Sequence, residues 1–125
     1  MATHPHAVVL VVEDDDSVRA LTIASIEELG FTVLSASGAK EAMKILEERS
    51  DIQLLLTDVV MPEITGGQLA KEALILRPAL KVLFTTGYTR NAIVHNGMLD
   101  PGITLLSKPF TLEQLSDAIH RVMSA

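Results

Sequence analysis

The sequence predicts an α/β domain in which a doubly wound, five-stranded parallel sheet carries helices on both faces. Five apolar runs of strand length recur along the chain, and they alternate with segments whose apolar residues follow helical spacing. The runs are nearly continuous in apolar residues, which is typical of strands buried on both faces of a parallel sheet. Right-handed crossovers between such strands place helices on both faces of the sheet.

The five predicted strands correspond to the apolar runs. They cover residues 7–12, 31–35, 52–57, 81–86 and 103–107. No internal repeat, low-complexity tract or linker interrupts their succession. We therefore expect one domain over residues 1–125, with residues 1–6 as a flexible N-terminus.

Helical segments separate most of these strands and follow the last one. They cover residues 16–29, 39–49, 67–77 and 112–123. Gly30 stands where a C′ glycine ends the first helix. Thr65 with Gln68, and Thr111 with Gln114, have the spacing of capping boxes at the starts of the third and the last of these helices.

In the first helix, one stripe of residues at helical spacing is expected to face the core. The stripe consists of Val18, Leu21, Ser25 and Leu29. Ile23 and Ile26 lie beside it and are expected at the edge of the core. Asp16 or Ser17 is the predicted N-cap, because both side chains can accept hydrogen bonds from backbone N–H groups.

Composition excludes several classes of function. The 125 residues carry a formal charge of −6 and 3% aromatic residues, which disfavours binding to nucleic acid or to an anionic membrane. The absence of cysteine excludes disulfide frameworks and thiol catalysis. No apolar run approaches the ~20 residues that span a bilayer. We therefore expect a cytoplasmic domain with no direct nucleic acid binding and no membrane insertion.

Polar residues stand at the ends of four predicted strands. Glu13 and Asp14 follow the first strand, and Asp58 follows the third. Thr86 ends the fourth strand, and Lys108 follows the fifth. Alone, each is ordinary, because a carboxylate after a strand is most often a helix cap or turn residue. In doubly wound folds, however, the carboxyl ends of the strands meet at one edge, where ligands bind, so their joint position indicates a site.

Three carboxylates gathered at one edge repel one another and need a cation. Two unit charges ~4 Å apart interact by about 4 kcal/mol at an effective dielectric constant of 20. Carboxylate oxygens combined with water and phosphate oxygens suit Mg²⁺, and Lys108 supplies a second positive charge. A metal ion, an ammonium and a hydroxyl can together hold a phosphoryl group, which a carboxylate can accept as a nucleophile.

Four segments of the chain resemble the receiver domain of two-component response regulators, and they occur in the order of that family. They are residues 11–15 (VVEDD), 56–62 (LTDVVMP), 84–87 (FTTG) and 106–110 (LSKPF). The resemblance covers essentially the whole chain and is greatest to receivers of hybrid histidine kinases and to free-standing single-domain regulators. It implies a flavodoxin-like sheet with the strand order 2-1-3-4-5.

The resemblance also implies a metal site. Asp58 matches the phosphoacceptor of the family, and Glu13 and Asp14 match the acidic pair that holds Mg²⁺ together with it. Val60 matches the residue whose backbone carbonyl is the third protein ligand to the metal. Mg²⁺ is therefore the expected cofactor.

Two further positions match residues that respond to the phosphoryl group in the family. Thr86 matches the switch hydroxyl that bonds a phosphoryl oxygen. Lys108 matches the lysine that pairs with the phosphoryl group, and the family usually has a cis peptide bond before Pro109.

The resemblance implies a signalling function and a protein partner. A sensor histidine kinase or a histidine phosphotransfer protein donates a phosphoryl group to Asp58, and the domain then changes conformation. Such a domain catalyses its own phosphorylation and dephosphorylation but is not a metabolic enzyme, and a weak homodimer is compatible with it. Two alternatives remain: a receiver-like binding module without phosphorylation, and a metal-dependent phosphohydrolase. The second is less favoured, because such enzymes usually carry an acid where Val60 stands.

The sequence departs from the family pattern at three places. Leu105 occupies the position of the usual switch aromatic, and we hypothesise that Tyr88 covers the phosphoryl group or takes over that role. The segment 89–102 is rich in asparagine, glycine and proline, so a helix there would be short; its His95 is expected to be a surface residue. Ile23 and Ile26 have a second interpretation, as a patch on which the partner docks.

Overall fold

The protein is an α/β domain whose strands and helices alternate, as predicted. The structure is a computed structural model and describes residues 7–59, 65–86 and 105–124. The strands are β1 (Val8–Val12), β2 (Thr32–Ala36), β3 (Ile52–Asp58), β4 (Lys81–Thr86) and β5 (Leu105–Ser107). The helices are α1 (Asp16–Glu28), α2 (Ala39–Glu48), α3 (Gly66–Leu76) and α5 (Leu112–Ser124). The segment 89–102 lies outside the described residues.

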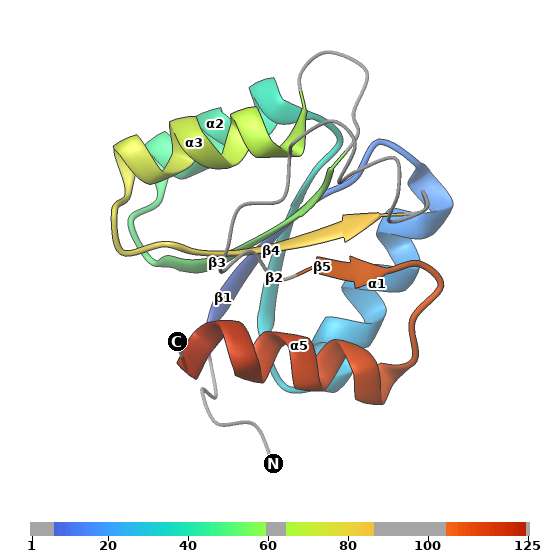
Figure 1. The fold of residues 1–125 in the computed structure, drawn as a ribbon. Coiled ribbons are helices and arrows are strands. Elements are labelled where there is room, and N and C mark those ends of the chain that lie inside the picture. Colours follow the sequence, from blue (N-terminus) through green and yellow to red (C-terminus); the bar gives the residue numbers. More distant parts are fainter. Residues whose placement is uncertain (1–6, 60–64, 87–104, 125) are drawn as a thin grey trace.

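All five strands are parallel, in the order β2-β1-β3-β4-β5. This confirms the predicted order 2-1-3-4-5. Helices α2 and α3 cover one face of the sheet, and α1 and α5 cover the other (Figure 1). Because every pair of neighbouring strands is parallel, the carboxyl ends of all five strands meet at one side of the molecule.

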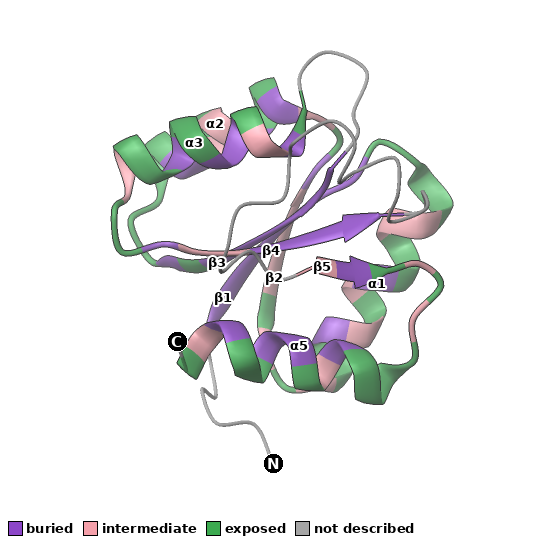
Figure 2. Cartoon of the chain, in the orientation of Figure 1, coloured by how far each residue is buried: buried purple, intermediate pink, exposed green. Residues whose placement is uncertain are grey.

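The central strands are buried on both faces, which explains their continuous apolar sequence. In β1, Leu10 points into the core beneath α2 and α3, whereas Val9 and Val11 point into the core beneath α1 and α5. Each helix presents its buried residues to the sheet and its exposed residues to solvent (Figure 2). The exposed residues include the apolar side chains of Leu21, Leu74, Ile75 and Leu112. Each fully buried Val, Leu or Ile side chain contributes roughly 1.5–3 kcal/mol of hydrophobic stabilisation.

The predicted core stripe of α1 is wrong at Leu21 but right at Leu29, which packs against the core cluster beneath α1 and α5. Leu21 is 71% exposed, whereas Thr22 and Ile26 are buried. Thr22 can be buried because its hydroxyl donates to the carbonyl of Val18 at 2.8 Å. Ile23 is half-buried and packs against the same cluster, which confirms its expected place at the edge of the core. Ile26 is 0% exposed, so it lies in the core itself and its interpretation as part of a docking patch is wrong.

The N-cap of α1 is Asp15, not Asp16 or Ser17. Its carboxylate accepts a hydrogen bond from the backbone N–H of Val18 at 3.0 Å. At the other end, Gly30 has a φ of 99°, which confirms it as the residue that ends the helix in the left-handed region.

The capping box at the start of α5 is complete. The Thr111 hydroxyl accepts from the backbone N–H of Gln114 at 3.0 Å, and the Gln114 side chain accepts from the backbone N–H of Thr111 at 2.9 Å. At α3, the Thr65 hydroxyl accepts from the backbone N–H of Gln68.

We expect Thr111→Ala to lower the free energy of unfolding by about 1 kcal/mol, because it removes the hydroxyl that caps α5. Urea unfolding followed by circular dichroism would measure this change. Ser124→Ala, at the exposed end of the same helix, is the control and should change the free energy by less than about 0.5 kcal/mol. Equal effects of the two substitutions would contradict a specific capping role.

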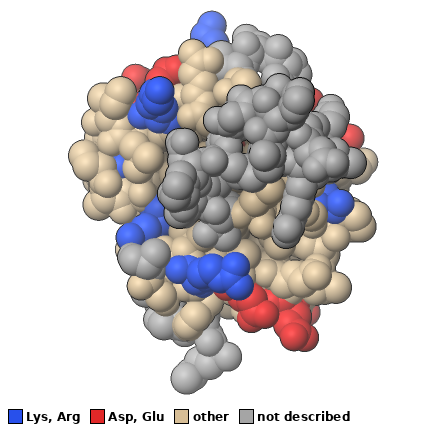
Figure 3. All heavy atoms as spheres, in the orientation of Figure 1, with Lys and Arg blue, Asp and Glu red and all other residues tan. Residues whose placement is uncertain are grey.

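Charged side chains of both signs lie side by side on the described surface seen in Figure 3. Within the described ranges, no helix is long and apolar enough to cross a lipid bilayer.

Candidate functional site

The carboxyl ends of β1 and β3 bring three acidic residues together. Val12, the last residue of β1, pairs with Thr57, so Glu13 and Asp58 leave neighbouring strands at the same level. Carboxylate oxygens of Glu13, Asp14 and Asp58 all lie within 4.8 Å of one another. The predicted convergence of these side chains at one edge is confirmed.

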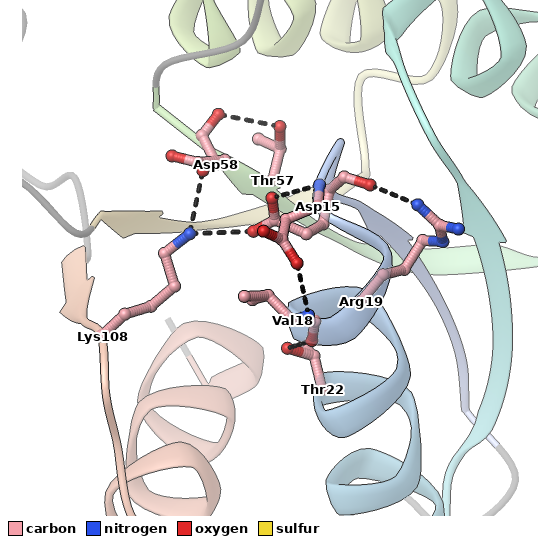
Figure 4. Close-up of polar contacts among 8 residues, drawn as sticks. Asp15, Val18, Arg19, Thr22, Thr57, Asp58 and Lys108 are labelled. Atoms are coloured by element: carbon pink, nitrogen blue, oxygen red, sulfur yellow. Dashed lines mark hydrogen bonds and ion pairs between the residues drawn. The ribbon is translucent and has the colours of Figure 1, made fainter.

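Lys108 lies between two of these carboxylates. Its Nζ is 2.8 Å from Glu13 Oε1 and 2.9 Å from Asp58 Oδ2 (Figure 4). Only 18% of the Lys108 side chain is exposed, against 6% for Glu13 and 9% for Asp58. Burial by itself lowers the pKa of Lys108, but hydrogen bonds to Glu13 and Asp58 outweigh it, so the pKa is raised and the ammonium stays charged.

The position of Lys108 is set by its backbone as well as by its side chain. Its N–H donates to the carbonyl of Thr86 at 2.7 Å, which joins the chain after β5 to the end of β4. The peptide bond between Lys108 and Pro109 is cis, as the resemblance implies. Thr86 itself is 1% exposed at the end of β4. The structure therefore links the predicted hydroxyl residue to the predicted lysine.

Glu13 is held at all of its polar atoms. Its backbone N–H donates to Ala36 O at 3.1 Å, and its carbonyl accepts from Arg19 Nη1 at 2.9 Å. Its Oε2 accepts from the N–H of Asp15 at 3.0 Å, while Oε1 faces Lys108. This side chain therefore has one fixed position at the edge of the sheet.

Asp14 differs from Glu13. It is exposed, and within residues 7–59, 65–86 and 105–124 its carboxylate has no hydrogen bond or ion pair. The cluster is therefore closed by Lys108 on one side and open to solvent at Asp14. Three converging carboxylates with one open side form a set of hard oxygen ligands that could hold a metal ion such as Mg²⁺.

Asp58 ends β3, and 6% of the whole residue, backbone included, is exposed. The Thr57 hydroxyl donates to its carbonyl at 3.1 Å (Figure 4). The next residue, Val59, donates its N–H to Thr85 O at 2.9 Å and accepts from the N–H of Gly66 at 2.7 Å. The start of α3 thus packs directly on the backbone that carries Asp58.

Gly66 is a residue of the site that sequence reasoning missed. A Cβ atom at this position would overlap the carbonyl oxygen of Asp58 and lie 2.9 Å from its carbonyl carbon. Only glycine allows α3 to approach Asp58 this closely. A signal was present in the Gly66–Gly67 pair at the predicted helix start, but the pair does not identify which segment it contacts.

Some of the predicted residues lie outside the described part of the chain. Val60, the predicted carbonyl ligand, and Tyr88, the proposed substitute aromatic, are among them, as is His95. Leu105 is described: it is half-buried and packs against a small cluster that contains Phe84. The position of the usual switch aromatic is thus filled by an aliphatic side chain.

Comparison with known proteins gives a consistent result. The family model described as "Response regulator receiver domain" matches residues 9–120. Sensor kinase CckA of Brucella abortus is 36% identical over 118 residues, and the match covers 94% of this chain but 12% of that protein. Response regulator receiver protein CpdR of the same organism is 34% identical over 117 residues, which cover 94% of this chain and 97% of CpdR.

Solved structures share the fold. The receiver domain of the hybrid histidine kinase CckA is 32% identical to this chain, with a TM-score of 0.77, and the match covers 93% of this chain and 98% of that one. A receiver domain protein from Clostridium thermocellum is 28% identical with a TM-score of 0.82, and the match covers 94% of each chain.

Proposed function

Because the chain belongs to the response regulator receiver domains of two-component systems, we propose that Asp58 is the residue that accepts the phosphoryl group. One observation supports this assignment above the others. The Asp58 carboxylate lies beside both an acidic pair and the Lys108 ammonium, within 4.8 Å of the former and 2.9 Å from the latter. Glu13 also contacts Lys108 beside two carboxylates, so the match of Asp58 to the phosphoacceptor position of the family is what distinguishes the two.

We propose that Glu13, Asp14 and Asp58 hold Mg²⁺, with the backbone carbonyl of Val60 as a further ligand. The open side of the cluster at Asp14 supports this, because Mg²⁺ keeps several waters and binds through few carboxylates. When bound, the ion would neutralise charge on the transferring phosphoryl oxygens.

In the proposed transfer, an Asp58 carboxylate oxygen forms a bond to phosphorus as the bond between phosphorus and the donor histidine nitrogen breaks. The electron pair of that bond leaves with the imidazole. Lys108 would stabilise the negative oxygens that arrive, and the Thr86 hydroxyl would donate to one of them. The buried backbone of Asp58 keeps the nucleophile in place for an in-line approach.

The proposed donor is a sensor histidine kinase or a histidine phosphotransfer protein. Residues 1–125 would act as one receiver domain in the cytoplasm, with self-catalysed phosphorylation and dephosphorylation as its only chemistry. The proposal that Tyr88 covers the phosphoryl group, because Leu105 is aliphatic, belongs to the same account.

Incubation with a small-molecule phosphodonor, with Mg²⁺ or with a chelator, tests this function. We expect intact-protein mass spectrometry to show one stable phosphoryl group that requires Mg²⁺. A chain that gains none would act as a binding module without phosphorylation. Rapid turnover of many phosphate esters would instead indicate a phosphohydrolase.

We expect Asp14→Asn to raise the Mg²⁺ concentration needed for half-maximal phosphorylation about 10-fold or more, because it removes one anionic ligand from the open side. A Mg²⁺ titration of the phosphorylation rate would measure this shift. Asp15→Asn removes a neighbouring charge while asparagine still caps α1. A shift of the same size in this control would mean that net charge, rather than ligation by Asp14, sets the Mg²⁺ requirement.

A further inference from the structure

Four successive acidic residues follow β1, and the structure gives them different partners. Carboxylate oxygens of Glu13 and Asp14 lie together with that of Asp58. Asp15 caps α1, and Asp16, whose side chain is 88% exposed, pairs with Arg19. The conformation of this turn therefore decides which two of the four carboxylates face Asp58.

Arg19 contacts both ends of the turn. Its Nη1 donates to the main-chain carbonyl of Glu13 at 2.9 Å, and its Nη2 donates to Asp16 Oδ1 at 2.6 Å. Its backbone N–H also donates to the carbonyl of Asp15 at 2.9 Å. The planar guanidinium fixes two acceptors at once, which a lysine ammonium on a flexible stem does less well. Figure 4 shows the side chain reaching from the first turn of α1 back toward the end of β1.

We propose that Arg19 is a positioning residue of the metal site, which acts by holding the Glu13 carbonyl and with it the peptide that leads to Asp14. The inference rests on the proposed function, because it takes Glu13, Asp14 and Asp58 as the Mg²⁺ ligands. The Glu13 carboxylate has its own supports in Lys108 and in the N–H of Asp15.

Asp14 depends on the turn more than Glu13 does. Among the residues that the structure describes, none bonds the Asp14 carboxylate, so only its backbone directs it toward Asp58. The Glu13–Asp14 peptide is the backbone nearest to it, and Arg19 is the side chain that bonds the carbonyl of this peptide. Removal of the Arg19 side chain should therefore mainly disturb the position of the Asp14 carboxylate. Residues that orient metal ligands typically change metal affinity by about 10-fold or more when they are removed.

Calorimetric titration of the full chain with Mg²⁺ tests this role. We expect Arg19→Met, which keeps the apolar stem, to bind Mg²⁺ about 10-fold more weakly than the wild type. Simple electrostatics predicts the opposite, because removing a positive charge near a cation site strengthens cation binding. Asp16→Asn keeps the bond from Arg19 to the Glu13 carbonyl and should change the affinity by about twofold at most. Arg49→Met, which removes an exposed arginine paired with Asp51, should leave it unchanged.

Phosphorylation rates separate positioning from a general loss of stability. At saturating Mg²⁺, the rate of Arg19→Met should return to within about twofold of the wild-type rate, because the defect lies in metal binding. If Arg19→Met does not fold, Arg19→Lys replaces it and should show a smaller loss of Mg²⁺ affinity in the same direction.

Three outcomes would overturn the inference. Unchanged or tighter Mg²⁺ binding by the Arg19 variant, with normal binding by the wild type, would exclude the positioning role and leave the proposed function intact. An equal loss in Asp16→Asn would assign the effect to the ion pair rather than to the Glu13 carbonyl. Absence of Mg²⁺ binding by the wild type would refute the proposed metal site itself, and the role of Arg19 with it.

Discussion

Gly66→Ala is expected to lower the free energy of unfolding by about 3 kcal/mol, at the upper end of the cost of overpacking a rigid contact. The added Cβ would overlap the backbone carbonyl oxygen of Asp58, and because the backbone fixes the position of a Cβ, no side-chain rotation can move the two atoms apart. Either α3 or the end of β3 must shift. Chemical denaturation of the wild type and the variant would measure the loss.

The matched control is Gly67→Ala, one residue further into α3. Alanine favours a helix by about 0.5–1 kcal/mol over glycine, so this variant should be as stable as the wild type or more stable. If Gly66→Ala were as stable as Gly67→Ala, this result would contradict the close contact between α3 and the Asp58 backbone. Because the displaced atom belongs to Asp58, we also expect Gly66→Ala to be phosphorylated more slowly than the control.

The second large effect is expected from Lys108→Met. Methionine keeps much of the aliphatic stem but leaves the buried carboxylates of Glu13 and Asp58 without their cation. Removing one partner of a fully buried ion pair costs about 3–5 kcal/mol. Since this site is open to solvent at Asp14, we expect a loss of about 2–3 kcal/mol in the absence of metal.

Mg²⁺ distinguishes this explanation from a simple loss of packing. A divalent cation can replace the missing positive charge, so Mg²⁺ should raise the melting temperature of Lys108→Met more than that of the wild type. Lys108→Arg, which keeps the charge, should behave like the wild type in this respect. An equal Mg²⁺ effect on all three proteins would contradict the charge-balancing role of Lys108.

The difference in free energy of unfolding between the wild type and Lys108→Met depends on pH in one definite direction. The pKa of Lys108 is raised in the folded protein by its two carboxylate partners, net of the opposing effect of burial. Its contribution to stability is therefore fully present below its unfolded pKa of about 10.4 and is lost as the pH rises through the higher folded value. The gap between wild type and Lys108→Met should persist at neutral pH and close only in strongly alkaline solution.

The sheet was predictable because its strands are apolar runs whose ends are marked by polar residues. The bounds of β4 are confirmed residue for residue, those of β1, β2 and β3 differ from the prediction by one residue at one or both ends, and β5 ends at Ser107 as predicted. The acidic cluster was predictable for the same reason: its residues directly follow strands, and parallel strands bring their carboxyl ends to one edge of the sheet.

Features that depend on packing between distant segments were not predictable. Apolar residues lie all around α1, so spacing alone did not decide whether Leu21 or Ile26 faces the sheet. The role of Gly66 depends on a contact with Asp58, eight positions earlier, that no local pattern encodes. Likewise, nothing in the acidic run distinguishes the residue that caps the helix from the residue that binds Arg19.

The central claim is that Asp58 accepts the phosphoryl group, and peptide mapping of the phosphorylated protein tests it most directly. After incubation with a phosphodonor and Mg²⁺, the phosphoryl group should be found on the peptide that contains Asp58, and Asp58→Asn should gain none. Asp51→Asn, at an exposed carboxylate before β3, should be phosphorylated like the wild type. A phosphoryl group on another residue, or an undiminished amount in Asp58→Asn, would contradict the account.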